Sequence, residues 1–308
     1  MENLKKNDCH VLLVSFPMLG VHVTYCTSLS GFNRISNLAT RDFPSFVFTN
    51  VKYNDWATQS IKEHIQLLNS EENPRILVMN TLDALEFDAL RVLKDSVTMV
   101  GVGPSIPSAF LEGKDRSDTS FGTDLQSISK NYMDWLDEKP NELVIYIAFG
   151  SYAEISNQLM EERAEGLLKS GRPFLWVVRK GINGENPEEK LRCKQELEKQ
   201  GKIVTWCSQV EVLHHPSMSC FLNQCGWNST LESTASGVPI VACLLWNQRR
   251  IQDFEIIGLV RVNDEGIVEK DDLERCIDVV MKGEECRKNA KKWRDLAKKA
   301  TKENGSSN

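Results

Sequence analysis

The sequence predicts an α/β protein in which parallel sheets are covered by helices and the chain is divided into two lobes. Short apolar runs alternate with segments of helical spacing along most of the 308 residues. The predicted strand at 142–149 is continuously apolar after Glu142, which is typical of strands covered on both faces. A polar, Gly- and Ser-rich stretch at 112–122 separates two such series and predicts an interdomain linker. We therefore expect an N-terminal lobe (1–112), a linker (113–130) and a C-terminal lobe (131–308).

In the N-terminal lobe, a strand is predicted at 10–16, and a second apolar run follows almost at once at 21–26. Parallel neighbours need a crossover of about a dozen residues or more, for which there is no room here. Either these two strands pair as a hairpin or a segment is missing between them. The pattern further predicts a helix at 56–68, a strand at 75–79, a helix at 83–93 and a strand at 97–101.

The C-terminal lobe continues the alternation. Helices are predicted at 131–137, 157–169 and 188–199, and strands at 142–149, 173–178 and 203–205. Between 218 and 248 the pattern predicts strand, tight turn, helix and strand, with Asn228 and Ser229 opening the helix. A helix near 252–257, a strand at 259–262 and two amphipathic helices at 271–281 and 285–301 follow. In the last helix we expect the lysines to face solvent and Trp293 and Leu296 to turn inward.

Bulk composition excludes several classes of protein. Hydrophobic residues make up 41% and charged residues 26% of the chain, as in ordinary globular proteins. The net charge of −6 argues against a nucleic-acid backbone as the main partner. The nine cysteines stand singly, without a Cys-x-x-Cys pair, and favour buried free thiols of a reducing compartment over a disulfide framework or a zinc site.

The N-terminus superficially imitates a secretory signal, because Lys5 and Lys6 precede the apolar run. Pro17 interrupts that run and no clear small-residue cleavage site follows, so a first strand is the better interpretation. No apolar stretch approaches transmembrane length, and we expect a soluble, cytoplasmic protein without a membrane span.

Four segments follow predicted strands at the point where each strand ends: Ser151, Trp206, the stretch 224–229 and the stretch 245–248. In open α/β sheets, ligands bind in the crevice beyond the carboxyl ends of the strands. These four segments should therefore converge on one ligand site.

The residue types in that site indicate a nucleotide sugar. Gly226 lets the backbone approach an anion, and the helix opened by Asn228 and Ser229 directs free N–H groups at negative charge. Glu232, one helical turn later, can accept hydrogen bonds from a pair of sugar hydroxyls. Trp206 offers a flat face for a base. Taken singly, each has a plainer explanation, since a lone tryptophan usually caps a core and a lone Gly-x-Asn-Ser usually caps a helix.

The stretch from Trp206 to Arg249 resembles the signature box of plant UDP-dependent glycosyltransferases. It has Trp-x-x-Gln at its start, Cys-Gly-Trp-Asn-Ser at 225–229 and Glu232 after that centre. The resemblance runs from Arg41 to the C-terminus. It is closest to the branch holding crocetin, anthocyanin 5-O- and auxin-type glucosyltransferases.

That resemblance implies a fold of the GT-B type, with two Rossmann-like lobes of which the N-terminal one is incomplete. It implies UDP-glucose as donor substrate, no other cofactor and no metal. The acceptor would be a small plant metabolite such as a flavonoid, an auxin or a carotenoid acid, glucosylated with inversion on a hydroxyl or carboxyl. The implied donor-binding residues are Ser151, Trp206, Cys207, Gln209, Gln224, Gly226, Trp227, Asn228, Ser229, Glu232 and Gln248.

Several positions depart from the family pattern. The family's diphosphate-contacting His is Gln224 here, and its sugar-binding acidic residue and Gln appear as Gln248 and Arg249. The family's catalytic His follows a Gly, but here Gly20 is followed by Val21, and nothing matches the Asp that orients that His. We assign no catalytic residue. The alternatives are a glucosyltransferase of reduced or lost activity, or a non-catalytic remnant or truncated gene product that binds UDP or a partner.

The adjacent pair His214 and His215 suggests a metal site at first sight. Neighbouring residues on a helix point in different directions, and no Cys or carboxylate follows at ligand spacing. We therefore expect no metal there.

Overall fold

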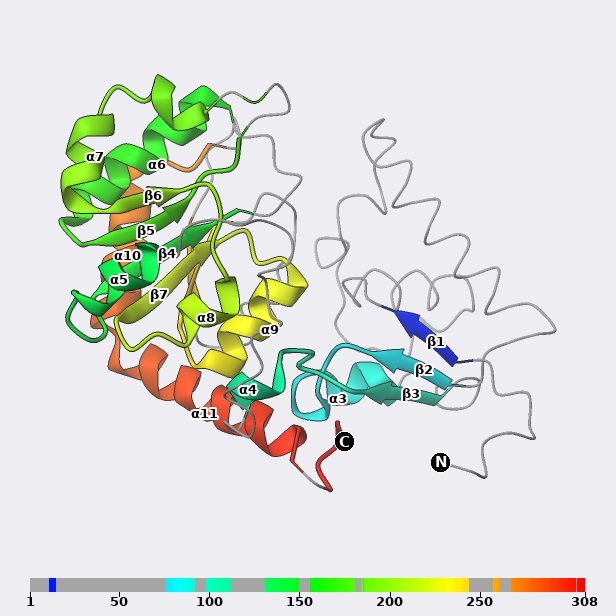
Figure 1. Cartoon of the computed structure of the whole chain (residues 1–308). Helices are drawn as coiled ribbons and strands as arrows, with labels where there is room; N and C mark the ends of the chain where they lie inside the picture. The colour runs from blue at the N-terminus through cyan, green and yellow to red at the C-terminus, as the bar shows by residue number, and fades with distance from the viewer. Residues whose placement is uncertain are drawn as a thin grey trace. The chain divides into compact units, whose positions relative to one another are not determined.

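The computed structural model describes residues 11–14, 76–91, 98–111, 131–149, 156–180, 184, 186–243, 257–260, 267–302 and 304–307. They fall into two compact units (Figure 1). The first unit comprises 1–105, 246–249 and 299–308, and the second comprises 106–245 and 250–298. The predicted strand at 21–26, the helix at 56–68 and the linker at 113–130 lie outside the described residues.

The first unit contains a parallel sheet in the order β1-β2-β3. Its strands are β1 (Val11–Val14), β2 (Ile76–Met79) and β3 (Thr98–Gly101), and helix α3 (Asp83–Arg91) runs between the last two. Val11 pairs with Ile76, so the first strand takes a parallel partner from much later in the chain. This is the β-α-β alternation that the sequence predicts.

The second unit contains a six-stranded sheet in the order β6-β5-β4-β7-β8-β9, and every neighbouring pair is parallel. The strands are β4 (Val144–Ala148), β5 (Phe174–Val177), β6 (Lys202–Val204), β7 (Met218–Asn223), β8 (Ile240–Ala242) and β9 (Ile257–Leu259). The α/β fold class with parallel sheets is confirmed.

The strand order reverses between β4 and β7. The chain first adds β5 and β6 on one side of β4, and then returns to add β7, β8 and β9 on the other side. In doubly wound sheets, ligands bind beyond the carboxyl ends of the strands at such a reversal. The fold therefore places its preferred binding position beside the ends of β4 and β7.

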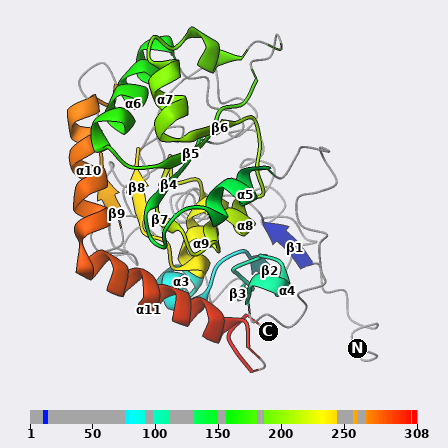
Figure 2. The same ribbon diagram turned by 60° about the vertical axis from the view of Figure 1, so that its left-hand side comes forward.

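The described part of the second unit contains the helices α4 (Ser108–Leu111), α5 (Asn131–Asp137), α6 (Asn157–Ser170), α7 (Lys194–Gln200), α8 (Gln209–Leu213), α9 (Trp227–Ser236) and α10 (Lys270–Lys282), with α11 (Glu284–Ala300) after them. Figure 2 shows α10 lying along the β9 side of the sheet, where it also contacts α6. The predicted helices at 131–137, 157–169, 271–281 and 285–301 are confirmed to within two residues at each end.

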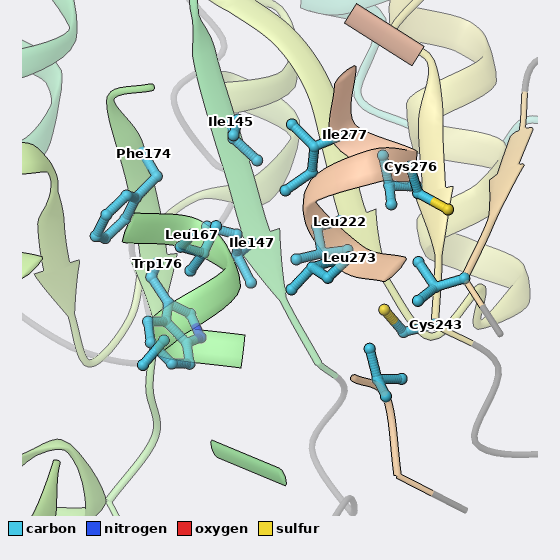
Figure 3. Packing of buried hydrophobic residues seen from close by; sticks show 14 of the residues in the cluster. Ile145, Ile147, Leu167, Phe174, Trp176, Leu222, Cys243, Leu273, Cys276 and Ile277 are labelled. Atoms are coloured by element: carbon cyan, nitrogen blue, oxygen red, sulfur yellow. The ribbon is translucent and has the colours of Figure 1, made fainter. Parts of the chain in front are cut away.

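The core consists of two apolar layers, one on each face of the sheet. Ile145 and Ile147 point into the layer shared with α6 and α10 (Figure 3). Val144 and Tyr146, the alternate residues of the same strand, point into the layer shared with α5 and α8. The prediction that this strand is central and covered on both faces is confirmed, because β4 is buried from both sides.

The helix predicted at 188–199 is wrong as a single element. The structure has a 3₁₀ turn, η4 (Pro187–Lys190), and then α7, with Leu191 between them in an extended conformation (φ −71°, ψ 131°). The Leu191 side chain is buried in the α6 layer. Anchoring this one apolar residue outweighs the helical propensity of the surrounding Glu and Lys residues.

The strand predicted at 259–262 is displaced, since β9 begins at Ile257, where a helix was predicted to end. Its register is set by β8, with Ile240 opposite Ile257. A Cβ on Gly258 would lie 2.5 Å from Val280 Cγ2, so α10 packs directly on this backbone. A glycine that looks like a strand breaker in sequence is thus the residue that lets the helix approach.

In α11 the lysines at 291, 292 and 299 are exposed, as predicted, whereas Lys298, which was expected on the same solvated face, is half-buried. Trp293 and Leu296 are half-buried, whereas Ala290 and Ala297 are fully buried. The inward face of α11 is therefore lined most deeply by alanines, which permit close helix packing. Within the described part of the chain, no helix combines the length and apolarity needed to cross a membrane.

Candidate functional site

Two helices that follow β6 and β7 bring three of the predicted donor-binding residues into contact. Gln209 is the first residue of α8, while Ser229 and Glu232 lie on α9. Gln209 Nε2 donates to Ser229 Oγ (3.0 Å) and to Glu232 Oε2 (2.6 Å). One amide thus ties both helices together at the carboxyl edge of the sheet and orients the carboxylate.

Tyr146 extends this network from the central strand β4. Its hydroxyl donates to Gln209 Oε1 (3.4 Å) and lies 3.3 Å from Cys207 Sγ. The ring stacks on Phe221, with centroids 4.7 Å apart. Burial raises the pKa of Tyr146 well above its ordinary value, so the phenol stays neutral. The sequence analysis missed this residue, and its signal was the single hydroxyl in an otherwise apolar strand.

The two cysteines of this region are neutral thiols. Burial raises the pKa of Cys207 to about 12 and that of Cys225 further still. A thiol of this kind is a poor nucleophile. Because the Cys207 side chain is buried against Tyr146, its contact with any ligand would come from its backbone.

Glu232 is a half-buried carboxylate whose pKa is raised by burial and lowered by the hydrogen bond from Gln209. A raised pKa means that the folded chain binds this proton more readily than the unfolded chain. Stability attributable to Glu232 therefore rises as the pH falls through the folded-state pKa, and the ionised form costs stability above it.

Replacing Gln209 by alanine should raise the Glu232 pKa further, because the amide that stabilises the carboxylate is lost. Carboxyl-carbon NMR titration of the purified protein measures this shift. Gln158→Ala, which removes an exposed amide on α6, is the matched control and should leave the titration unchanged. An unchanged Glu232 titration in Gln209→Ala would contradict the role of this bond.

The N-terminus of α9 lies at the same edge. Gly226 is the N-cap (φ −55°, ψ 142°), and Thr230 N donates the first intrahelical bond to Gly226 O (2.9 Å). N–H groups of a helix's first turn point out of its end and favour anions. A Cβ built on Gly226 would meet no atom within 4 Å, so the space beside this backbone is open.

The predicted start of this helix needs correction. It begins at Trp227 rather than Asn228, and no side chain caps it. Ser229 Oγ accepts from Gln209 instead. The turn before the helix is built differently, since Cys225 has the left-handed conformation (φ 62°) and its N–H donates to Asn223 Oδ1 (2.5 Å). Asn223, at the end of a strand, is the residue that sequence analysis overlooked.

The remaining predicted residues are placed as follows. Trp206, directly after β6 and a threonine, is half-buried, as is Trp227, while Asn228 is exposed. Gln224 is half-buried, and its Oε1 is shielded from solvent without a hydrogen-bond partner. Ser151 and Gln248 lie outside the described residues.

Neither histidine of the adjacent pair joins this edge. His214 Nδ1 lies 2.9 Å from Val210 O, and His215 lies between Ser217 Oγ (2.8 Å) and Asp137 Oδ1 (3.1 Å). The residues that the structure describes contain no cluster of His, Cys, Asp or Glu able to hold a metal ion.

Comparison with known proteins gives the family context. The model of the family described as UDP-glucoronosyl and UDP-glucosyl transferase matches residues 121–301. UDP-glycosyltransferase 75C1 of Solanum lycopersicum is 49% identical over 288 residues, covering 89% of this chain and 61% of that protein. Crocetin glucosyltransferase, chloroplastic, of Gardenia jasminoides is 48% identical, with 90% and 60% coverage.

A solved structure is similar as well. Os79 from O. sativa in complex with UDP superposes with a TM-score of 0.82 at 30% identity, covering 97% of this chain and 70% of that one. The chain spans about three fifths of the length of the curated relatives named above, with 61% and 60% of their lengths covered.

Proposed function

The chain belongs to the UDP-glucoronosyl and UDP-glucosyl transferase family, and from that premise we propose that it binds a UDP-sugar for glucosyl transfer. The donor is UDP-glucose, and the acceptor is a hydroxyl or carboxyl of a small plant metabolite such as a flavonoid, an auxin or a carotenoid acid. The observation that carries the proposal is the contact of Gln209 with Ser229 and Glu232 beside the open N-terminus of α9.

Each part of the nucleotide has a matching group at this edge. Glu232, held by Gln209, accepts hydrogen bonds from the two ribose hydroxyls. The first turn of α9 directs N–H groups at the diphosphate, and Gln224 adds an amide. Trp206 stacks on the uracil ring. Ser151 and Gln248 remain proposed donor-binding residues. Cys207, Trp227 and Asn228 are proposed to bind the donor as well, Cys207 through its backbone and the other two from their positions at the start of α9.

Glucosyl transfer also requires removal of the acceptor proton by a general base. At the described edge, Tyr146 and Cys207 are held in their neutral, protonated forms by burial, and the Glu232 carboxylate is engaged by Gln209. These groups suit binding rather than proton abstraction. This observation favours a second candidate, a chain that binds UDP without transferring the sugar.

Incubation of the purified chain with UDP-glucose and a panel of flavonoid, auxin and carotenoid-acid acceptors separates the two candidates. Glucoside formation above a boiled control supports the transferase. UDP binding in calorimetry without any glucoside supports the binding protein. Absence of both would overturn the proposal. We place this function in the cytoplasm, since the cysteines at 193, 207, 220, 225, 243, 276 and 286 are all free.

Replacing Trp206 by alanine should weaken UDP binding about tenfold, because stacking of a base on an indole contributes roughly 1–3 kcal/mol. Calorimetric titration with UDP measures the loss. Trp135→Ala is the matched control, since this half-buried indole on α5 contacts Lys139 instead. Equal UDP affinity in Trp206→Ala and wild type would count against stacking.

A further inference from the structure

Arg163, on α6, is a buried cation that has no hydrogen-bond partner in the part of the chain that the structure describes. Its side chain is fully shielded from solvent (0% exposed), and its Nε, Nη1 and Nη2 atoms all lack a hydrogen bond. Burial lowers its pKa to about 10, which leaves the guanidinium charged at neutral pH. A buried charge without a hydrogen-bonded counter-charge is costly, so a ligand that brings negative charge to it would be bound favourably.

The position of this guanidinium follows from the direction of α6. The helix starts at the carboxyl edge of the sheet, just after β4, and helical side chains tilt toward the N-terminus of their helix. The Arg163 Cζ atom lies 3.6 Å above the ring of Phe149, the residue directly after β4. It also interacts electrostatically with Cys243, the residue directly after β8. Arg163 therefore sits at the carboxyl edge, across the ends of these strands.

Strand β7 lies between β4 and β8 in the sheet, so the turn that follows β7 and contains Gln224 lies at the same carboxyl edge. Cys243 N donates to Asn223 O (2.8 Å), which keeps the two strand ends level. Gln224 follows directly, with its shielded side-chain oxygen also unpartnered. Rotation of an amide exchanges its oxygen and nitrogen, so this group can present a donor as well. Unsatisfied polar groups from α6 and from the turn after β7 thus lie at the same edge of the sheet, where the strand order reverses.

We propose that Arg163 is an additional anion-binding residue of the donor site, whose guanidinium binds the diphosphate of a UDP-sugar opposite the N-terminus of α9. This inference rests on the proposed function. A guanidinium offers five N–H donors in a planar fork that fits phosphate oxygens. The Gln224 side chain is uncharged, so it brings no positive charge to the diphosphate. Arg163 would supply that charge from α6.

The test compares UDP with uridine, which lacks the phosphates, in calorimetric titrations of wild type and Arg163→Met. We expect UDP affinity to fall tenfold or more and uridine affinity to stay unchanged. Arg163→Lys keeps the positive charge but loses the planar guanidinium, and its UDP affinity should fall between those of wild type and Arg163→Met. The control Arg192→Met removes a charge from a side chain that is 90% exposed and should change neither ligand. An unchanged ratio of UDP to uridine affinity in a folded Arg163→Met overturns the inference.

Thermal unfolding provides a second readout. A purely structural arginine predicts that Arg163→Met melts at a higher temperature and binds UDP as before, because a buried uncompensated charge has been removed. The proposal predicts a higher melting temperature together with weaker UDP binding. If Arg163→Met does not fold, the UDP-to-uridine ratio of Arg163→Lys decides, and a wild-type ratio overturns the inference.

Failure of the proposed function has a different signature. If wild type binds neither UDP nor uridine, the donor site itself is wrong. Inorganic pyrophosphate then tests Arg163 alone. A pyrophosphate-induced rise in melting temperature that is present in wild type and lost in Arg163→Met supports an anion site. Equal responses of the two proteins overturn it.

Discussion

Replacing Phe221 by alanine is expected to lower the free energy of unfolding by about 3–5 kcal/mol, the range for large-to-small substitutions of buried aromatic residues. Phe221 lies on β7, inside the sheet, and its side chain is 0% exposed. Its ring stacks on Tyr146, so the substitution leaves a cavity and also removes an aromatic contact. Urea denaturation measures the loss as a lower midpoint at an unchanged slope.

Val279→Ala is the control for this experiment. Val279 lies on α10 with 53% of its surface exposed, so its truncation should change stability by no more than about 0.5 kcal/mol. Phe221→Leu, which keeps most of the apolar volume, should fall between the two. A cost below about 1 kcal/mol for Phe221→Ala would mean that the neighbouring side chains can close the cavity, contrary to the packing described.

Replacing Glu232 by alanine is expected to weaken UDP binding about a hundredfold. Hydrogen bonds to a charged group contribute roughly 1.5–3 kcal/mol, and about 1.4 kcal/mol corresponds to tenfold in affinity. Gln209 already orients the carboxylate at 2.6 Å, so little side-chain freedom is lost when the ribose binds. Calorimetry with UDP at neutral pH measures the effect.

A nucleotide without the two ribose hydroxyls provides the internal control. Dideoxy-UDP should bind wild type and Glu232→Ala equally, because the bonds in question are absent from both complexes. Glu284→Ala removes an exposed carboxylate at the start of α11 and should leave UDP binding unchanged. Since burial raises the Glu232 pKa, removing this carboxylate relieves a cost at neutral pH, and the lost affinity does not reflect unfolding. Comparable loss with dideoxy-UDP would contradict the ribose role.

The local hydrophobic pattern of the sequence was sufficient to predict a helix or strand wherever that element buries a continuous apolar face. The apolar run that became β4 and the amphipathic spacing of α10 predict their elements closely, because each satisfies its own periodicity. The pattern gave the wrong element where a single tertiary contact determines the local backbone conformation. Leu191 interrupts a charged helix to reach the core, and Gly258 continues a strand because α10 packs on it.

In the candidate site, too, some features could be predicted from the sequence and others only from the tertiary structure. Gln209, Ser229 and Glu232 could each be named from the motif, since their spacing within the chain is local. Their mutual hydrogen bonds could not, because α8 and α9 meet only through the folded sheet. Tyr146 lies within an apolar strand and Arg163 within a helix that carries several other charged residues, so neither stands out in the sequence.

The sequence by itself determined the alternating α/β architecture and the family, because periodicity and the signature box are properties of neighbouring residues. The tertiary structure decided which groups share one edge. The strand order placed the ends of β4, β7 and β8 side by side, joined Gln209 to the residues of α9, and buried the charge of Arg163 at that edge. The physical reason is that burial, counter-charge and hydrogen-bond partners come from residues distant in the chain, which no local pattern specifies.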